Sequence, residues 1–267
     1  MRKTGLFLAS IVLSATLWAE LPEKKGLDVI NRANAEAYIG FLASDALEGR
    51  EAGFRGGRIA GEYIVSNLKT MGIEPLFESY YQPFEAYNKE RQKKGRFQVH
   101  PDSIAKLKQG VHQKLSMNNI LGKIEGKNPN EYVIIGAHYD HLGFDPMLDG
   151  DRVYNGADDN ASGVSAVLQV AKAFLATGVQ PERTVIFAFW DGEEKGLLGS
   201  KYFVQTFLEM DKVKGYLNYD MIGRNKDESK PMHVVYFYTE AHPVFGDWLK
   251  NDIKKYGLNL TPDYRPW

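Results

Sequence analysis

Histidine and carboxylate side chains gather at four points of this sequence, and each point adjoins a run of apolar residues. They are His138, Asp140 and His141 in HYDHLG, Asp158 and Asp159 in NGADDNASG, Asp191, Glu193 and Glu194 in DGEEKGLLGS, and Asp220 in NYDMIGR. Carboxylates that converge repel one another unless a cation lies among them. Imidazole together with several carboxylates is a ligand set for Zn²⁺ or a similar divalent ion. The residue types therefore indicate metal-assisted chemistry.

The Glu193-Glu194 pair could divide two tasks of such chemistry, because adjacent side chains diverge. One carboxylate can face a metal ion while the other acts on a water molecule as a general base. Other catalytic patterns are missing from the sequence, which has no cysteine, no HExxH and no GxSxG. The lack of cysteine also excludes disulfides, thiolate zinc sites and cysteine nucleophiles.

Three apolar segments, residues 132–135, 184–190 and 215–218, are expected to be strands, and each leads into one of these clusters. Residues 161–176 have the apolar spacing of an amphipathic helix and follow the paired aspartates. Residues 193–207 also have a helical pattern. The alternation predicts an α/β fold with a mixed, largely parallel sheet. Because ligands bind at the carboxyl ends of strands in such sheets, the clusters are expected to converge on one edge.

The chain has 267 residues, of which 43% are hydrophobic, and a formal net charge of -1. This composition allows one large α/β domain or two small ones and does not indicate a nucleic-acid-binding protein. Residues 34–71 predict two helices, and arginine contacts are expected to order the glycine-rich loop 47–58 between them, in preference to an anion site. Residues 87–114, rich in Lys and Arg, are interpreted as a basic surface insertion and not as a nucleic-acid patch.

Arg2 and Lys3 precede an uncharged apolar run, residues 6–18, that is too short to span a bilayer comfortably. This pattern predicts a signal peptide at residues 1–19, cut after Ala19, with an uncleaved anchor as the alternative. Residues 20–267 would then form a single domain that is periplasmic or secreted, with no stable membrane insertion after cleavage.

The four motifs occur in the order and approximate spacing of one family, which this sequence resembles over about residues 35–224, apart from the basic insertion. It is the two-zinc aminopeptidase family, which also includes aminopeptidase Y, glutamate carboxypeptidase and the transferrin receptor. The upstream FLASDALEGREAGFRGG is similar to the entry segment of that family. The resemblance implies a three-layer α/β sandwich of the zinc exopeptidase type, with a central mixed, mostly parallel sheet flanked by helices. It also implies two Zn²⁺ ions and peptide substrates.

The resemblance assigns the metal ligands residue by residue. His138, Asp158 and Asp220 would hold one zinc ion. Asp158 would also bridge to a second zinc ion, which Glu194 would hold as well.

The remaining roles also follow from the resemblance. Glu193 would be the general base that takes a proton from water. Asp140 would hydrogen-bond the free ring nitrogen of His138 and fix its tautomer. Asp159 would follow the bridging aspartate across a peptide bond that is typically cis. His141 is expected to be a structural residue that could line the site.

One part of the family pattern is missing, since the second zinc ion also needs a late histidine. His242 is the last histidine, and TEAHPVFGDW around it is expected to begin a helix. We therefore expect a C-terminally truncated sequence or a variant with a degenerate second site. The sequence as a whole predicts an exported zinc-dependent metallo-aminopeptidase that hydrolyses N-terminal residues from peptides. A glutaminyl cyclase-like acyltransferase and a non-enzymatic binding module of the same fold are the alternatives.

Overall fold

The computed structural model describes residues 21–89, 96–225, 227 and 229–267. The predicted signal peptide at residues 1–19 lies outside the described residues and stays a prediction, as does the division of the chain into domains. Among the described helices, none combines the length and the apolar character that a membrane crossing requires.

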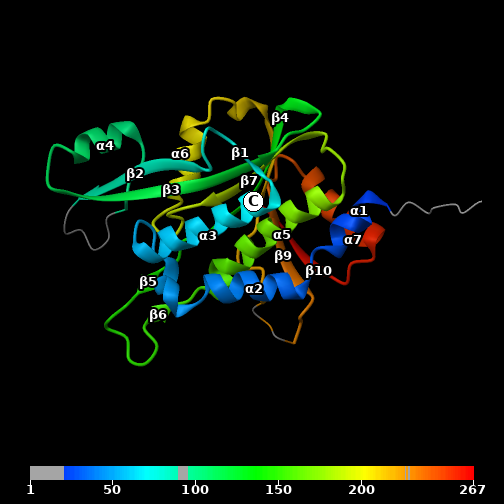
Figure 1. Cartoon of the computed structure of the whole chain (residues 1–267), viewed down its shortest axis with the longest axis horizontal. Coiled ribbons are helices and arrows are strands. Elements are labelled where there is room, and N and C mark those ends of the chain that lie inside the picture. The colour runs from blue at the N-terminus through cyan, green and yellow to red at the C-terminus, as the bar shows by residue number, and fades with distance from the viewer. Residues whose placement is uncertain (1–20, 90–95, 226, 228) are drawn as a thin grey trace, which may run out of the picture.

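A six-stranded mixed sheet forms the centre of the molecule (Figure 1). Its strands are β1 (Glu74–Pro75), β2 (Tyr81–Lys89), β3 (His112–Ile124), β4 (Asn128–His138), β7 (Arg183–Trp190) and β8 (Val213–Asn218). The order is β1-β3-β7-β4-β8, and β2 also pairs with β3. Strands β7, β4 and β8 are parallel, whereas β3 is antiparallel to β7, β1 and β2. The three parallel strands therefore end at the same edge of the sheet.

Helices cover both faces of this sheet. One face carries α1 (Pro22–Asp28), α2 (Arg32–Leu42), the short helix η1 (Asp45–Arg50), α3 (Arg55–Met71) and α5 (Gly163–Ala176), and the other carries α6 (Leu198–Thr206) and η3 (Met210–Lys212). Strand β7 shows why two helical layers are needed, because its side chains alternate between faces. Val185, Phe187 and Phe189 pack under α3 and α5, and Ile186, Ala188 and Trp190 pack toward α6. The predicted α/β fold, a mixed sheet flanked by helices, is confirmed.

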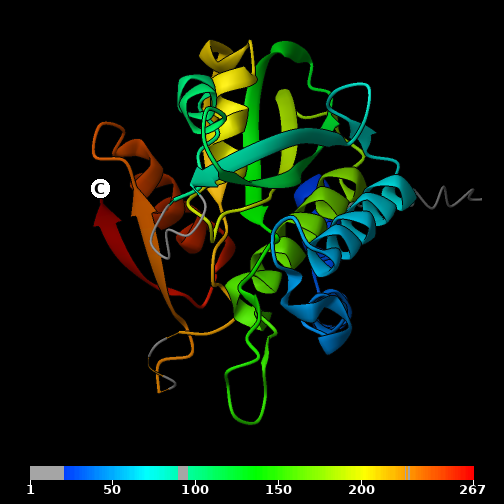
Figure 2. The same ribbon diagram turned by 90° about the vertical axis from the view of Figure 1, so that its left-hand side faces the viewer.

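The C-terminal part forms a second, two-stranded sheet. Strands β9 (His233–Tyr238) and β10 (Thr261–Pro266) pair in parallel, and α7 (Val244–Tyr256) connects them. Figure 2 shows this unit, in orange and red, beside the main sheet. The helix expected to begin in TEAHPVFGDW is α7, which starts at Val244.

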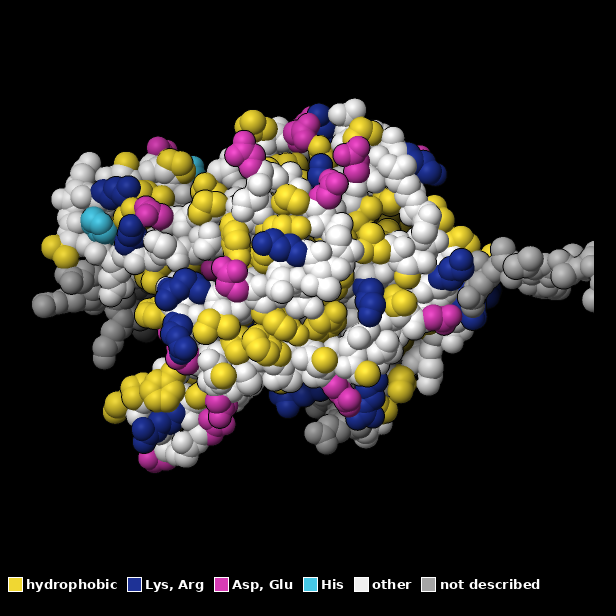
Figure 3. Space-filling model, in the orientation of Figure 1, with side chains coloured by type: hydrophobic (Ala, Val, Ile, Leu, Met, Phe, Trp, Pro, Cys, Tyr) yellow, Lys and Arg dark blue, Asp and Glu magenta, His cyan; other side chains and the backbone are white. Residues whose placement is uncertain are grey.

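The predicted basic insertion corresponds to an arm that extends from the main body (Figure 1, left). It comprises the end of β2, the short helix α4 (Pro101–Leu107) and the start of β3. Its described lysines are exposed, and Lys114 pairs with Glu85 at 2.7 Å while Lys108 lies over the ring of Tyr87. Figure 3 shows its cations interspersed with acidic and hydrophobic side chains. The described residues of the arm thus form a solvated surface element.

Candidate metal centre

The carboxyl ends of β4, β7 and β8 bring three of the predicted clusters to one place. His138 is the last residue of β4, and Asp191, Glu193 and Glu194 follow β7. Asp220 follows β8. The paired aspartates lie in a short helical turn, η2 (Ala157–Ser162), that leads into α5. Convergence at one sheet edge is therefore what the structure shows.

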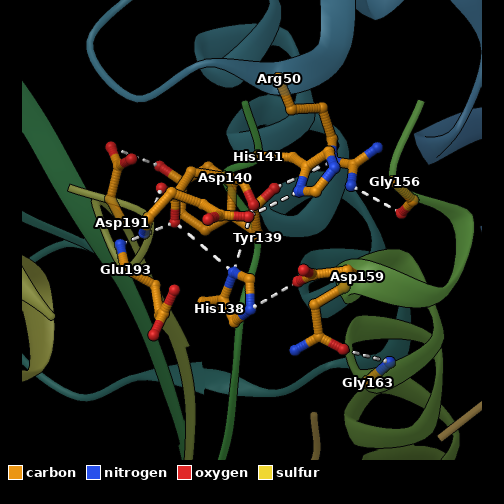
Figure 4. Close-up of polar contacts among 12 residues, drawn as sticks. Arg50, His138, Tyr139, Asp140, His141, Gly156, Asp159, Gly163, Asp191 and Glu193 are labelled. Carbon is orange, nitrogen blue, oxygen red and sulfur yellow. Dashed lines mark hydrogen bonds and ion pairs between the residues drawn. The ribbon is translucent and has the colours of Figure 1, made fainter. Parts of the chain in front are cut away.

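A first group of possible metal ligands centres on His138 (Figure 4). Its Nε2 lies 3.2 Å from Oδ1 of Asp159 and 3.5 Å from Oδ1 of Asp220. One ligand atom from each of the three residues lies within 4.8 Å of the other two. His138 is buried, whereas both carboxylates are partly open to solvent. A small ion could thus reach this group from outside.

The other ring nitrogen of His138 faces Asp140. Nδ1 lies 3.2 Å from the backbone carbonyl oxygen of Asp140 and 3.7 Å from its carboxylate. Asp140 therefore contacts the imidazole mainly through its backbone carbonyl oxygen, and its predicted role of fixing the tautomer stays a prediction. Burial opposes protonation of His138, yet the carboxylates of Asp140, Asp159 and Asp220 raise its pKa to about 12. Since these carboxylates hold a proton so firmly, their surroundings suit a cation, and the donor set fits a divalent metal ion.

A second group shares Asp159 with the first. It consists of His141, Asp159 and Glu194, again with ligand atoms within 4.8 Å of one another. The Nδ1 atom of His141 lies 2.7 Å from Oε1 of Glu194. Among the residues that the structure describes, these are the two groups of at least three His, Asp or Glu side chains that could hold a metal ion. A carboxylate common to both is the arrangement in which two metal ions lie side by side.

Asp158, the residue predicted to bridge, lies in neither group. Its carboxylate accepts hydrogen bonds from the backbone N–H of Gly223 at 2.6 Å and the hydroxyl of Ser162 at 3.3 Å. Because adjacent side chains diverge, only one of the two aspartates can face His138, and that residue is Asp159. The cis peptide bond also differs from the expectation, since it joins Asp159 to Asn160 and not Asp158 to Asp159.

Two residues that the sequence did not single out fix η2 against the loop that carries Asp220. The Asn160 amide donates to the carbonyl of Tyr219 at 2.9 Å, and its oxygen accepts from the N–H of Gly163 at 3.0 Å. The Ser162 hydroxyl accepts from the N–H of Ile222 at 3.1 Å. These contacts set the position of Asp220 relative to Asp159. The polar residues within NGADDNASG were their only sequence signal.

Asp140 also positions the Glu193-Glu194 pair. Its carboxylate accepts hydrogen bonds from the backbone N–H groups of Glu193 at 3.0 Å and Glu194 at 3.3 Å. Glu193 itself is half-buried. Burial raises its pKa, and the neighbouring charges of Asp140, Glu194 and Asp220 add to this, while His138 opposes it. A carboxylate with a raised pKa accepts protons more readily near neutral pH, as a general base must.

Arg50 connects the backbone segments around the site through hydrogen bonds. Its side chain is buried, with 1% of the residue exposed, and it donates to four backbone carbonyls. These belong to Leu42, Tyr139, Asn155 and Gly156. Burial lowers the pKa of Arg50 to about 10, against the opposing charges of nearby carboxylates. The expectation that arginine contacts order loop 47–58 is confirmed, but the sequence did not link Arg50 to the site.

Fold and site together define an α/β protein of the zinc exopeptidase type, with histidines and carboxylates grouped at the carboxyl edge of its sheet. Residues 119–267 match the sequence model of Peptidase family M28. This match covers more than half of the chain, and the chain belongs to that family.

Two curated relatives are bacterial enzymes. The chain is 39% identical over 107 residues to leupeptin-inactivating enzyme 1 of Streptomyces exfoliatus, a stretch that makes up 39% of this chain and 22% of the relative. It is 38% identical over 115 residues to an aminopeptidase of Pseudomonas aeruginosa, covering 42% of this chain and 19% of the relative. The aligned stretch thus spans about a fifth of each relative.

Solved structures share the fold. The Legionella pneumophila LapA aminopeptidase superposes with a TM-score of 0.62 at 21% identity, covering 91% of this chain and 56% of that one. The glutaminyl cyclase of Porphyromonas gingivalis superposes with a TM-score of 0.58 at 17% identity, covering 89% and 77%. At these identities the likeness concerns the fold alone, and it does not separate peptidases from cyclases.

Proposed function

We propose that this chain is the metal-binding core of a zinc-dependent exopeptidase, and specifically of an aminopeptidase that removes N-terminal residues from peptides. The observation that carries the proposal is the pair of ligand groups sharing Asp159. Membership of Peptidase family M28 and the aminopeptidase named among its relatives support it.

Each residue then has a chemical role. His138, Asp159 and Asp220 would hold one zinc ion, and Asp159 with Glu194 would hold a second. Bound zinc supplies a Lewis acid that polarises the peptide carbonyl and makes water more acidic. Glu193 would accept a proton from the attacking water and deliver it to the leaving amine. Asp140 would keep Glu193 and Glu194 in place through their backbone N–H groups.

Exchange of Glu193 for Gln tests the assigned base in the complete protein. Glu193→Gln keeps the size of the side chain but cannot accept the proton, and loss of a general base costs about 10²–10⁴-fold in rate. We expect this loss in the release of aminoacyl reporters, with zinc content unchanged. Glu182→Gln is the control, because Glu182 lies exposed beside Lys127. Unchanged turnover by Glu193→Gln would contradict the assignment.

Glutaminyl cyclase activity is the second candidate, because solved cyclases share this fold. Peptides that begin with glutamine distinguish the two reactions. A peptidase releases free glutamine, whereas a cyclase releases ammonia and leaves the chain length unchanged. A protein that binds zinc but catalyses neither reaction would support a binding module.

We also propose that the protein is exported, on the basis of the basic and apolar pattern of residues 1–19. N-terminal sequencing of protein from the periplasm or medium tests this, and a mature chain beginning at Glu20 is expected.

A further inference from the structure

His141 is the histidine of the site whose role the sequence left open. Its ring is almost buried and is held on several sides. Its backbone N–H donates to the carbonyl of Arg50 at 3.1 Å, and the ring meets that of Tyr154 edge-on. It also packs so closely against Gly156 that a Cβ there would come within 2.6 Å of its Cδ2. His141 is therefore fixed before any ligand binds.

The distances within the two ligand groups distinguish the role of His138 from that of His141. Around a tetrahedral zinc ion with bonds of about 2.0–2.1 Å, neighbouring ligand atoms lie about 3.3 Å apart. The distances of 3.2 Å and 3.5 Å from His138 to Asp159 and Asp220 match this spacing. The 2.7 Å between His141 and Glu194 is too short for it and has the length of a hydrogen bond.

We propose that His141 is a positioning residue, whose Nδ1–H donates to Oε1 of Glu194 and leaves the second oxygen of that carboxylate for a metal ion. This inference rests on the proposed function, since it explains how Glu194 is oriented as a ligand. Outer hydrogen bonds of this kind orient ligating carboxylates. Here the contact joins the loop after β4 to the loop after β7, so it sets the position of Glu194 relative to the strand that carries His138.

Arg50 supports this contact from behind. The backbone of Arg50 accepts from His141, and its guanidinium donates to the carbonyls of Tyr139 and Gly156. Tyr139 lies two residues before His141, and Gly156 lies against the imidazole ring. The chain of contacts runs from Arg50 through His141 to Glu194, and each step uses a backbone or ring atom that packing holds in place.

Two substitutions at one position test the hydrogen bond in the complete protein. His141→Asn places an amide N–H close to the position of Nδ1, whereas His141→Leu has similar bulk and no donor. Loss of an outer hydrogen bond lowers metal affinity by about 10–100-fold. We expect His141→Leu to weaken one of two zinc equivalents by this factor in a competition titration with a chelator. His141→Asn should stay within about threefold of the wild type. His242→Leu, at an exposed position, is the control.

Nitrogen NMR of the histidine rings provides a readout that does not depend on activity. In the zinc-loaded protein labelled with ¹⁵N-histidine, we expect metal-bound nitrogen for His138 and a protonated, metal-free Nδ1 for His141. A metal-bound nitrogen on His141, or equal loss of one zinc equivalent from both variants, would overturn the proposal in favour of a ligand role. Unchanged affinity in His141→Leu would overturn it as well.

The experiment also separates this inference from the proposed function. Zinc binding is measured without substrate, so an inactive protein with two zinc equivalents and a sensitive His141→Leu variant would support the inference and contradict the peptidase assignment. An active peptidase whose zinc affinity does not change in His141→Leu would support the peptidase assignment and contradict the inference.

Discussion

Neighbouring substitutions at Asp158 and Asp159 provide the sharpest test of the site, because the two residues differ in what they contact. Asp159 belongs to both ligand groups, whereas Asp158 accepts hydrogen bonds from Gly223 and Ser162. We expect Asp159→Asn to weaken both metal equivalents strongly and Asp158→Asn to weaken them little. The two variants carry the same chemical change at adjacent positions, so each is the control for the other.

The size of each effect follows from the contacts. A four-ligand zinc site is worth about 10–16 kcal/mol, hence about 2.5–4 kcal/mol per ligand, and loss of one ligand costs about 10²–10³-fold in affinity. Asp159→Asn should impose this loss on both ions. Asp158→Asn keeps an oxygen that can accept from the N–H of Gly223. It should lose the charge on the hydrogen bonds from Gly223 and Ser162 and the 3.7 Å contact with the exposed Arg224, which together cost about 1 kcal/mol, or less than tenfold.

The assay is a titration of metal-free protein with zinc in the presence of a chromophoric chelator of known affinity. Circular dichroism of each metal-free variant shows whether the fold is kept. If Asp158→Asn loses as much affinity as Asp159→Asn, or more, then the geometry assigned to η2 is wrong and the bridging role predicted from the sequence for Asp158 would stand.

Two further predictions concern stability. Burial, with the nearby charge of Asp140, raises the pKa of Asp191 to about 7, while the unfolded chain titrates near about 3.9. Between these values the folded chain holds a proton that the unfolded chain does not, so the free energy of unfolding falls as pH rises from about 4 to about 7. Asp191→Asn removes the cost of ionising the buried carboxyl. The difference in melting temperature between the variant and the wild type should therefore be larger, in favour of the variant, at pH 8 than at pH 5. A difference that is the same at both pH values would contradict the raised pKa. Arg50→Met leaves four carbonyls without their donor and should lower the free energy of unfolding by at least about 3 kcal/mol in urea titrations. Arg55→Met, which breaks only an exposed pair with Glu48, should cost no more than about 1 kcal/mol, and equal effects would refute the role of Arg50.

Strands β4 and β7 could be predicted from the sequence because they are buried on both faces, whereas β8, an exposed edge strand, was predicted from its short apolar segment alone. Residues 132–135, 184–190 and 215–218 lie within β4, β7 and β8, and the two helices of residues 34–71 are α2 and α3. The helix expected over residues 193–207 begins only at Leu198. Residues 192–197 form a turn instead, in which Leu197 has a φ of 60°. Asp140, in the loop after β4, holds that turn through the N–H groups of Glu193 and Glu194, and a local pattern cannot reveal such a distant partner.

The same limit explains the register of the paired aspartates. NGADDNASG contains two carboxylates of equal chemistry, and both adjoin the start of α5. The choice between them depends on Gly223, which lies 65 residues from Asp158 in the sequence. Its N–H donates a hydrogen bond to the Asp158 carboxylate, which leaves Asp159 to face His138. Asn160 and Ser162 form further hydrogen bonds to the same loop, which carries Asp220. Local sequence could place an aspartate beside His138 but could not choose which one, because the choice is made by long-range contacts.

Arg50 bears on why the site needs a metal ion. It is a cation buried near Asp140, Asp159 and Glu194, and its charge acts on all three. Its donors, however, are directed to backbone carbonyls, so no carboxylate of the site is paired with it directly. Arg50 therefore moderates the repulsion among the carboxylates but leaves their oxygens free. His138 can offset one negative charge when protonated. The remaining carboxylates around Asp159 still exceed the cations, and a divalent ion between them restores the balance that neither Arg50 nor a proton can supply.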